Sequence, residues 1–295
     1  MKHEHESNKT LTGLKNRLLL LSRFKESHRF GSHLLDKRER GSVGPRMDET
    51  GPYLLTEKVD QLQSSDTRER KTLALLNVVF KDESSHVRLL ANFPALSFLH
   101  VNRYYSDNVT RFIVKVPSLK SFTYTDIHER YSAMPLVLDS PGLQHLSIFD
   151  YGGLGSIQNM PHLETAYVGH LVPQPNDKFL RSFSSVGSLH LRLMDDVGLY
   201  YEDLPLSWNQ QSSVPGCLLA HLEIFVWDKF WERRRQEREC VEYILANSKC
   251  LKTAIVLPRC FYRLEEKEKM VEDIKSMYRV SASSQLITHS DSTNP

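Results

Sequence analysis

The chain has 295 residues, of which 40% are hydrophobic and 25% charged, and its 38 Lys and Arg nearly balance its 36 Asp and Glu. This length and apolar content suffice for one or two domains with a buried core. The net charge of +2 gives no strong field for attracting nucleic acid or anionic lipid, so electrostatics leaves the class of partner open.

The sequence gives no sign of secretion or membrane insertion. The longest apolar run near the N-terminus covers only residues 18–21, whereas a signal peptide needs roughly 7–15 apolar residues and a membrane helix about 20. The last third holds four cysteines without a C-x-x-C pair, which favours reduced thiols: Cys217, Cys240, Cys250 and Cys260. We therefore expect an intracellular protein, in cytoplasm or nucleus.

Residues 1–70 are expected to be mostly disordered. They mix charged residues with Ser, Gly and Pro, and this composition buries too little apolar surface to offset the entropy of ordering. One short helix is predicted near residues 14–24, where Leu14, Leu18 and Leu21 share a face.

A repeat begins where the composition changes, at Leu73. Its core is a hexad of the form L-x-x-L-x-L, whose first, fourth and sixth residues are apolar. The first residues of six copies are 23, 23, 24, 20 and 23 positions apart: Leu73-Leu76-Val78, Leu96-Leu99-Val101, Leu119-Phe122-Tyr124, Leu143-Leu146-Ile148, Leu163-Ala166-Val168 and Val186-Leu189-Leu191. Such intervals are typical of leucine-rich repeats, whose period is about 20–29 residues.

Each hexad predicts a short strand, because its fourth and sixth residues would point to the same side of a sheet. In four copies a proline stands two residues before the hexad, where it would end the preceding segment: Pro94, Pro117, Pro141 and Pro161. Stacked copies would join into one sheet and one core. Residues 71–207 are therefore predicted to form an irregular leucine-rich-repeat solenoid of the α/β class, with a short curved parallel sheet. An ordinary mixed sheet with coincidental spacing is the alternative.

The segments between the strands differ in kind. Residues 84–92 have helical spacing at Val87, Leu90 and Ala91, whereas residues 151–159 are rich in glycine and are expected to form a loop. The side of the sheet that these segments cover is therefore expected to be irregular.

Beyond residue 193 the repeat changes. Two later hexads stand further apart, Leu222-Phe225-Trp227 and Leu251-Ala254-Val256. Helices are predicted over 231–248 and 264–278, and a last strand over 283–288. The side chains expected to face inward from the two helices are Val241, Ile244 and Leu245 in the first and Met270, Ile274 and Met277 in the second.

Residues 208–257 resemble the FBD domain, the C-terminal module of a plant family of F-box and leucine-rich-repeat proteins. The resemblance is carried by Trp208, Ser213-Val214-Pro215, Cys217-Leu218, Leu222-Glu223, Phe225, Trp227, Tyr243-Ile244-Leu245, Asn247 and Cys250-Leu251-Lys252. The phrases at 75–83, 116–124 and 158–161 are also similar to the family's. The resemblance implies an FBD-like α/β cap over 208–288 that closes the solenoid, followed by a disordered tail at 289–295.

Members of that family usually begin with an F-box, which docks on the adaptor of a cullin-type ubiquitin ligase. The first Leu-Pro pair here is Leu204-Pro205 and the first Trp is Trp208, so the expected F-box pattern is missing from residues 1–70. We therefore expect that the ligase adaptor does not bind this chain.

Several patterns that suggest chemistry have plainer explanations. The glycines of 152–155 lack the Lys-Ser/Thr of a phosphate loop, and His3 and His5 lack a third metal ligand. The cysteine spacing of ten matches no zinc motif. Arg233–Arg235 is interleaved with Glu, which is typical of a solvated helix face and not of nucleic-acid binding. We therefore expect no catalytic residue, no metal and no cofactor.

The aromatic residues near the second-last helix are the best candidates for partner contact. Trp227 alternates with Phe225 in a predicted strand and is assigned to the core. Trp231 and the adjacent Phe230 precede the charged run and are the predicted protein-contact residues, since exposed aromatic side chains anchor interfaces.

The function predicted from the sequence is a non-catalytic protein-interaction module of the F-box/FBD/LRR type, and not an enzyme. One alternative is a substrate-recognition subunit of a cullin-type ubiquitin ligase, and the other is a truncated remnant without selected function. The partner is expected to be a protein, with no nucleic acid and no membrane.

Overall fold

The computed structural model describes residues 69, 71–76, 78–103, 109–126, 136–150, 156–158, 160–169, 177–192, 213–230, 235–258 and 264–288. All of them fall within the unit Gly51–Pro295. The predictions for residues 1–70, apart from Glu69, and for the tail 289–295 lie outside these residues. The same is true of the glycine-rich stretch 151–155.

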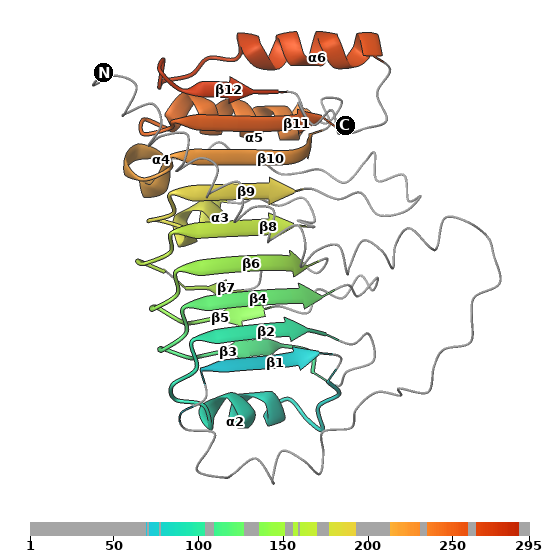
Figure 1. The fold of residues 1–295 in the computed structure, drawn as a ribbon, viewed down its shortest axis with the longest axis vertical. Helices are drawn as coiled ribbons and strands as arrows, with labels where there is room; N and C mark the ends of the chain where they lie inside the picture. The colour runs from blue at the N-terminus through green and yellow to red at the C-terminus, as the bar shows by residue number, and fades with distance from the viewer. Residues whose placement is uncertain are drawn as a thin grey trace, which may run out of the picture. The chain divides into compact units, whose positions relative to one another are not determined.

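Nine strands of the described residues form one open sheet in which every neighbouring pair is parallel. They lie in chain order, and Figure 1 shows their arrows pointing the same way from β1 to β12. The strands are β1 (Thr72–Leu76), β2 (Phe98–Asn102), β4 (Ser121–Asp126), β6 (His145–Asp150), β8 (Thr165–Gly169), β9 (Ser188–Arg192), β10 (Ile224–Phe230), β11 (Thr253–Pro258) and β12 (Gln285–Ile287).

A second, three-stranded parallel sheet and five helices complete the described elements. The strands of the second sheet are β3 (Phe112–Val114), β5 (Leu136–Leu138) and β7 (Ser156–Ile157). The helices are α2 (Ser85–Ala91), α3 (Asp177–Ser182), α4 (Gly216–Ala220), α5 (Arg235–Asn247) and α6 (Leu264–Ser276). The prediction of an α/β protein with a parallel sheet is confirmed. No helix of the described residues has the length and apolar content needed to cross a membrane.

The hexads supply the core. In every predicted copy from residue 96 onward, the three apolar side chains are at most 2% exposed and belong to one hydrophobic cluster. Parallel strands bury these residues well because the same positions of successive hexads lie next to each other, as Phe122 does between Leu99 and Leu146. Burial of a leucine-sized side chain contributes roughly 1.5–3 kcal/mol, so the repeated rows are the main source of stability.

The predicted register of the first hexad was wrong by three residues, because Leu73 and not Leu76 holds the fourth hexad position. Leu73 pairs with Leu99 and Leu75 with Val101, whereas Leu76 is 48% exposed on the other side of the sheet. The segment has apolar residues at 73, 75, 76 and 78, so its pattern fits two registers. Pairing with the neighbouring strand selects one of them, because a shift by an odd number of residues would turn every side chain over.

A recurring turn precedes the strands. The N–H of Leu119, the first residue of its hexad, donates to the carbonyl of Val116 at 3.1 Å, and Pro117 lies between them, where its fixed φ suits the turn. Gly142, in the next copy, approaches so closely that a Cβ would lie 2.6 Å from the Pro117 carbonyl oxygen, so this position requires glycine. The prolines that precede four of the hexads therefore mark the turns at which the chain enters the strands.

Three of the five described helices, α2, α5 and α6, lie where the sequence predicts them, with one error of orientation, whereas α3 and α4 were not predicted. α2 buries His86, Leu89 and Leu90, whereas Val87 and Ala91 are exposed. His86 is held in the core by stacking on Phe112 at 4.5 Å and by accepting a hydrogen bond from the Ile113 N–H at 2.9 Å. In α5 and α6 the six predicted apolar side chains are buried, and both helices belong to the same core as the sheet.

A buried ion pair joins the ends of two adjacent strands. Arg103, which follows β2, donates to the Asp126 carboxylate of β4 at 3.0 Å, and both side chains are almost fully buried. The Tyr124 hydroxyl donates to the same carboxylate at 3.2 Å, and Arg103 also donates to the carbonyl of Val109. These bonds satisfy the two charges inside the core, where an unpaired charge is costly.

The predicted division between residues 207 and 208 is not a break in the sheet. β9 pairs with β10 over five consecutive residues, from Ser188–Ile224 to Arg192–Asp228. The FBD-like segment therefore continues the same sheet as the hexads before it.

Candidate functional site

The side of the sheet that faces away from the core is the largest regular surface of the described residues. The strand registers align its side chains in three rows of nine, nine and eight residues, which together we call the outer face. The first row is Thr72, Phe98, Ser121, His145, Thr165, Ser188, Ile224, Thr253 and Gln285. The second is Ala74, His100, Thr123, Ser147, Tyr167, His190, Val226, Ile255 and Ile287. The third is Leu76, Asn102, Thr125, Phe149, Gly169, Arg192, Asp228 and Leu257.

Three rings meet at the centre of the outer face. Tyr167 of β8 lies 4.9 Å from the Phe149 ring of β6 and 4.4 Å from the His190 ring of β9, between ring centroids. Gly169 permits this arrangement, because a Cβ there would lie 2.6 Å from the Phe149 ring. Aromatic side chains that are packed in advance lose little freedom on binding, so such a cluster is suited to holding a partner.

Polar contacts extend the cluster to β10. Arg192 forms an ion pair with Asp228 at 3.5 Å, and both side chains are partly exposed. Burial raises the pKa of the Tyr167 phenol to about 12, although a hydrogen bond with Arg192 acts in the opposite direction. Tyr167 is therefore neutral at physiological pH and can act as a hydrogen-bonding group, but not as a base.

The hexad at 143–148 predicts that the residues between its apolar positions, Gln144, His145 and Ser147, are not buried, and Ser147 differs from this prediction. Gln144 and His145 are partly exposed, as expected, but Ser147 is only 2% exposed although it lies on the outer face. The Ser147 side chain is small. It lies between two larger side chains, that of Tyr167, which is its partner on β8, and that of Phe149 on the same strand, so these shield it from solvent. Its hydroxyl is buried without a hydrogen-bond partner.

The predicted contact residue Phe230 lies in the core. Phe230 ends β10 and is fully buried, with its ring edge-on to Trp227 at 6.3 Å, so its side chain presents no surface to a partner. A bulge after Asp228 turns it inward. Trp227 is in the core, as predicted. Trp231 lies outside the described residues, and its partner-facing role stays a prediction.

Little in the sequence indicates the outer-face cluster. Phe149, Tyr167 and His190 are about twenty residues apart along the chain, and only the parallel register brings them together. The sequence feature that could have indicated the cluster is that outward positions of neighbouring strands carry aromatic and histidine side chains.

Two of the described thiols, Cys217 and Cys240, do not have the properties of nucleophiles. Cys217 and Cys240 are buried, and burial raises the pKa of both, that of Cys217 to about 11. Cys250 is exposed. Over the residues that the structure describes, no three His, Cys, Asp or Glu side chains are placed to hold a metal ion.

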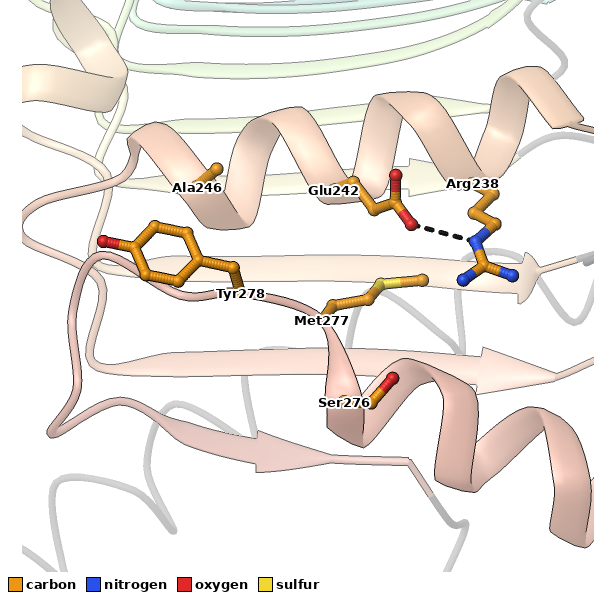
Figure 2. A pocket seen from close by; sticks show the side chains of 6 residues that line it. All are labelled: Arg238, Glu242, Ala246, Ser276, Met277 and Tyr278. Carbon is orange, nitrogen blue, oxygen red and sulfur yellow. Dashed lines mark hydrogen bonds and ion pairs between the residues drawn. The ribbon is translucent and has the colours of Figure 1, made fainter.

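A small pocket lies between α5 and the end of α6 (Figure 2). Its volume is about 290 Å³, and an Arg238–Glu242 ion pair at 2.9 Å forms one side of it. Tyr278, which is 72% exposed, stands at the other side. The charged groups of the pocket are already paired with each other, so it offers a small contact surface and no acid or base for chemistry. The lining residues are Arg238, Glu242, Ala246, Ser276, Met277 and Tyr278.

These features define an α/β protein with an open parallel sheet and a pre-packed outer surface. Comparison with known proteins then shows what the chain is similar to. Residues 210–256 match the FBD family, a stretch that contains α4, β10, α5 and most of β11. No solved structure matches the chain.

The chain is similar to several proteins of Arabidopsis thaliana. Two are putative F-box/FBD/LRR-repeat proteins: one is 34% identical, with 73% of this chain and 59% of the relative covered, and the other 36%, with 72% and 59% covered. A putative FBD-associated F-box protein is 36% identical, with 73% and 62% covered. The resemblance seen in the sequence is thus confirmed: the chain contains an FBD region and is related to the F-box/FBD/LRR-repeat proteins. It spans about three fifths of the length of these relatives.

Proposed function

We propose that the chain is a non-catalytic module that binds another protein through the outer face of its sheet. In this proposal the hexads form a leucine-rich-repeat solenoid, and the FBD region with the elements after it closes the C-terminal end. The observation that carries the proposal is the cluster around Tyr167, in which residues from four adjacent strands are held together on the surface. Tyrosine and arginine are enriched among residues that dominate binding energy.

The relatives support the same class of function. Their names combine an F-box, an FBD region and leucine-rich repeats. This chain matches the FBD family at residues 210–256, and its hexads have the spacing of leucine-rich repeats. Each repeat of this kind contributes one strand to the sheet, so a long partner can contact the outward side chains of several strands at once. The raised thiol pKa values and the paired charges of the pocket favour binding over catalysis.

Affinity capture from an Arabidopsis extract tests this proposal with two matched tyrosine substitutions. We expect that wild-type chain retains at least one protein, that Tyr167→Ala loses it, and that Tyr278→Ala keeps it. Tyr278 is the control because it is an exposed tyrosine in a different part of the described surface. If all three chains retain the same proteins, or if only Tyr278→Ala loses them, the outer face is not the binding surface.

A second function is favoured by the names of the relatives, which include an F-box. In this alternative the chain is a substrate-recognition subunit of a cullin-type ubiquitin ligase. A direct pull-down with the purified ligase adaptor separates the two. We expect no retention, because residues 1–70 lack the F-box pattern. Micromolar or tighter binding through those residues would establish the alternative.

A further inference from the structure

The outer face is depleted in charge. A quarter of the chain is charged, so twenty-six positions would hold about six charged residues at the average frequency. Among the described positions of the outer face there are two, Arg192 and Asp228, and they pair with each other at 3.5 Å. No other Lys, Arg, Asp or Glu stands on this face from β1 to β12.

Charged residues are instead concentrated at the edge where the strands begin. In the nine-stranded sheet, each strand from β2 to β11 is preceded by a residue whose N–H donates to the carbonyl of the residue before the neighbouring strand. Ser284 stands at the equivalent position before β12, so these residues form a row of their own. Five of its nine members are charged, and Glu223 and Lys252 form an ion pair across it at 2.7 Å. The row is Lys71, Ser97, Lys120, Gln144, Glu164, Gly187, Glu223, Lys252 and Ser284. We call it the rim. An uncharged centre beside a charged rim is the composition of a protein interface.

We propose that the outer face binds an uncharged stretch of polypeptide, made of hydroxyl, carboxamide, aromatic and aliphatic side chains. The inference rests on the proposed protein-binding function and names the chemistry of the partner. A Lys or Asp of a partner buried against β4–β9 would find no free opposite charge, since Arg192 and Asp228 are paired. Removing such a charge from water without compensation is strongly unfavourable.

The outer face can satisfy an uncharged partner. Its first two rows carry the hydroxyls of Ser121 and Thr123, which are partly exposed and can each donate and accept a hydrogen bond. The Thr165 hydroxyl lies in the same rows and already bonds the His145 ring at 2.9 Å. The Ser147 hydroxyl has no hydrogen-bond partner among the described residues, but it is buried, so a bound segment would meet Ser121 and Thr123 first.

The same charges argue against other occupants. Nucleic acid is held mainly by cations on its phosphates, and the single cation of the outer face is paired. An acidic peptide requires unpaired basic groups, and the one Lys or Arg on the described face, Arg192, is already paired. Both occupants are outcomes that the experiment can reveal.

The experiment uses a phage-displayed library of random twelve-residue peptides as the probe and the immobilised full chain as the target. We expect that the enriched peptides contain fewer Lys, Arg, Asp and Glu than the input library. One enriched peptide, made synthetically and labelled, is then titrated by fluorescence polarisation against three variants that unfold at the same temperature as the wild type.

The three variants distinguish the effect of an added charge on the outer face from the effect of a longer side chain and from the effect of a charge change at the rim. Thr123→Lys introduces a charge beside Ser147 in the register and should weaken binding by at least about tenfold. Thr123→Gln adds a similar length without charge and should weaken it less than about threefold. Glu164→Lys changes the charge at the rim and should leave the affinity within about twofold.

Charged peptides in the enriched pool, no enrichment at all, or an unchanged affinity of Thr123→Lys would overturn the inference. Stronger binding of a labelled single-stranded DNA to the wild type than any peptide shows would assign the face to nucleic acid instead. The results distinguish this inference from the proposed function. If the enriched peptides are charged while Tyr167→Ala still loses the captured protein, protein binding by the outer face stands, and only the uncharged chemistry of the partner is refuted.

Discussion

Substitution of Leu146 tests the register on which the outer face depends. Leu146 is 2% exposed in β6, between Phe122 of β4 and Ala166 of β8. A buried Leu→Ala change costs about 2–5 kcal/mol, and the cost rises with the volume of cavity that remains. Ala166 is too small to fill the space, so we expect about 3–5 kcal/mol for Leu146→Ala. This is a large part of a typical stability of about 5–15 kcal/mol.

Urea unfolding followed by far-ultraviolet circular dichroism gives the free energy of unfolding, and hydrogen exchange at β4 and β8 shows whether the neighbours loosen. Leu76→Ala is the matched control, because Leu76 is also a strand leucine but is 48% exposed, and we expect a change within about 0.5 kcal/mol. Ser147→Ala should be neutral or stabilising by up to about 1 kcal/mol, since it removes a buried hydroxyl without a partner. A cost for Leu76→Ala equal to that of Leu146→Ala would refute the register.

Three further predictions concern single groups. In folded protein Cys250 should react with a thiol reagent within minutes and Cys217 only after unfolding, read by peptide mass spectrometry; fast labelling of Cys217 would contradict its burial. The folded pKa of Tyr167, about 12, lies above its ordinary value of 10.0. Between these pH values the unfolded chain loses this proton while the folded chain keeps it. The contribution of Tyr167 is therefore complete below pH 10 and lost as pH rises to about 12, and Tyr167→Phe should show a weaker fall in urea midpoint over that interval. Arg103→Met should cost about 3–5 kcal/mol because the buried Asp126 carboxylate loses the opposite charge of Arg103, and adding Asp126→Leu should restore much of it; no restoration would mean that the pair is not coupled.

The sequence was sufficient for the inward half of the sheet. The first, fourth and sixth hexad positions carry apolar residues at a nearly constant interval, so the buried rows from residue 96 onward could be predicted. The first copy could not, because Leu75 and Leu76 are both apolar and only pairing with β2 distinguishes them. The short strands β3, β5 and β7 were missed, since two or three residues show no alternation.

The candidate site was beyond the reach of the sequence for a different reason. The residues of the outer face are interspersed with the buried ones, and none of them forms a local motif. Their common property, the near absence of charge, is visible only after the register has defined which positions share a surface. The aromatic residues chosen from the sequence, Phe230 and Trp231, were chosen by adjacency along the chain. Adjacency is a poor guide at Phe230, where a bulge turns the side chain into the core.

The same separation of rows predicts how related sequences differ. Inward positions such as Phe122 and Leu146 should stay apolar among relatives that are about one third identical, because replacing them costs several times more than replacing a surface residue. Outer-face positions such as Thr123 are free to change identity, but if the face binds an uncharged segment they should rarely gain a charge. Rim positions such as Glu164 are the control, since they tolerate either sign. Alignment of the relatives by these registers would give the charged fraction of each row. Equal charged fractions on the outer face and the rim would mean that the lack of charge here is a property of this chain alone and not of a surface kept for binding.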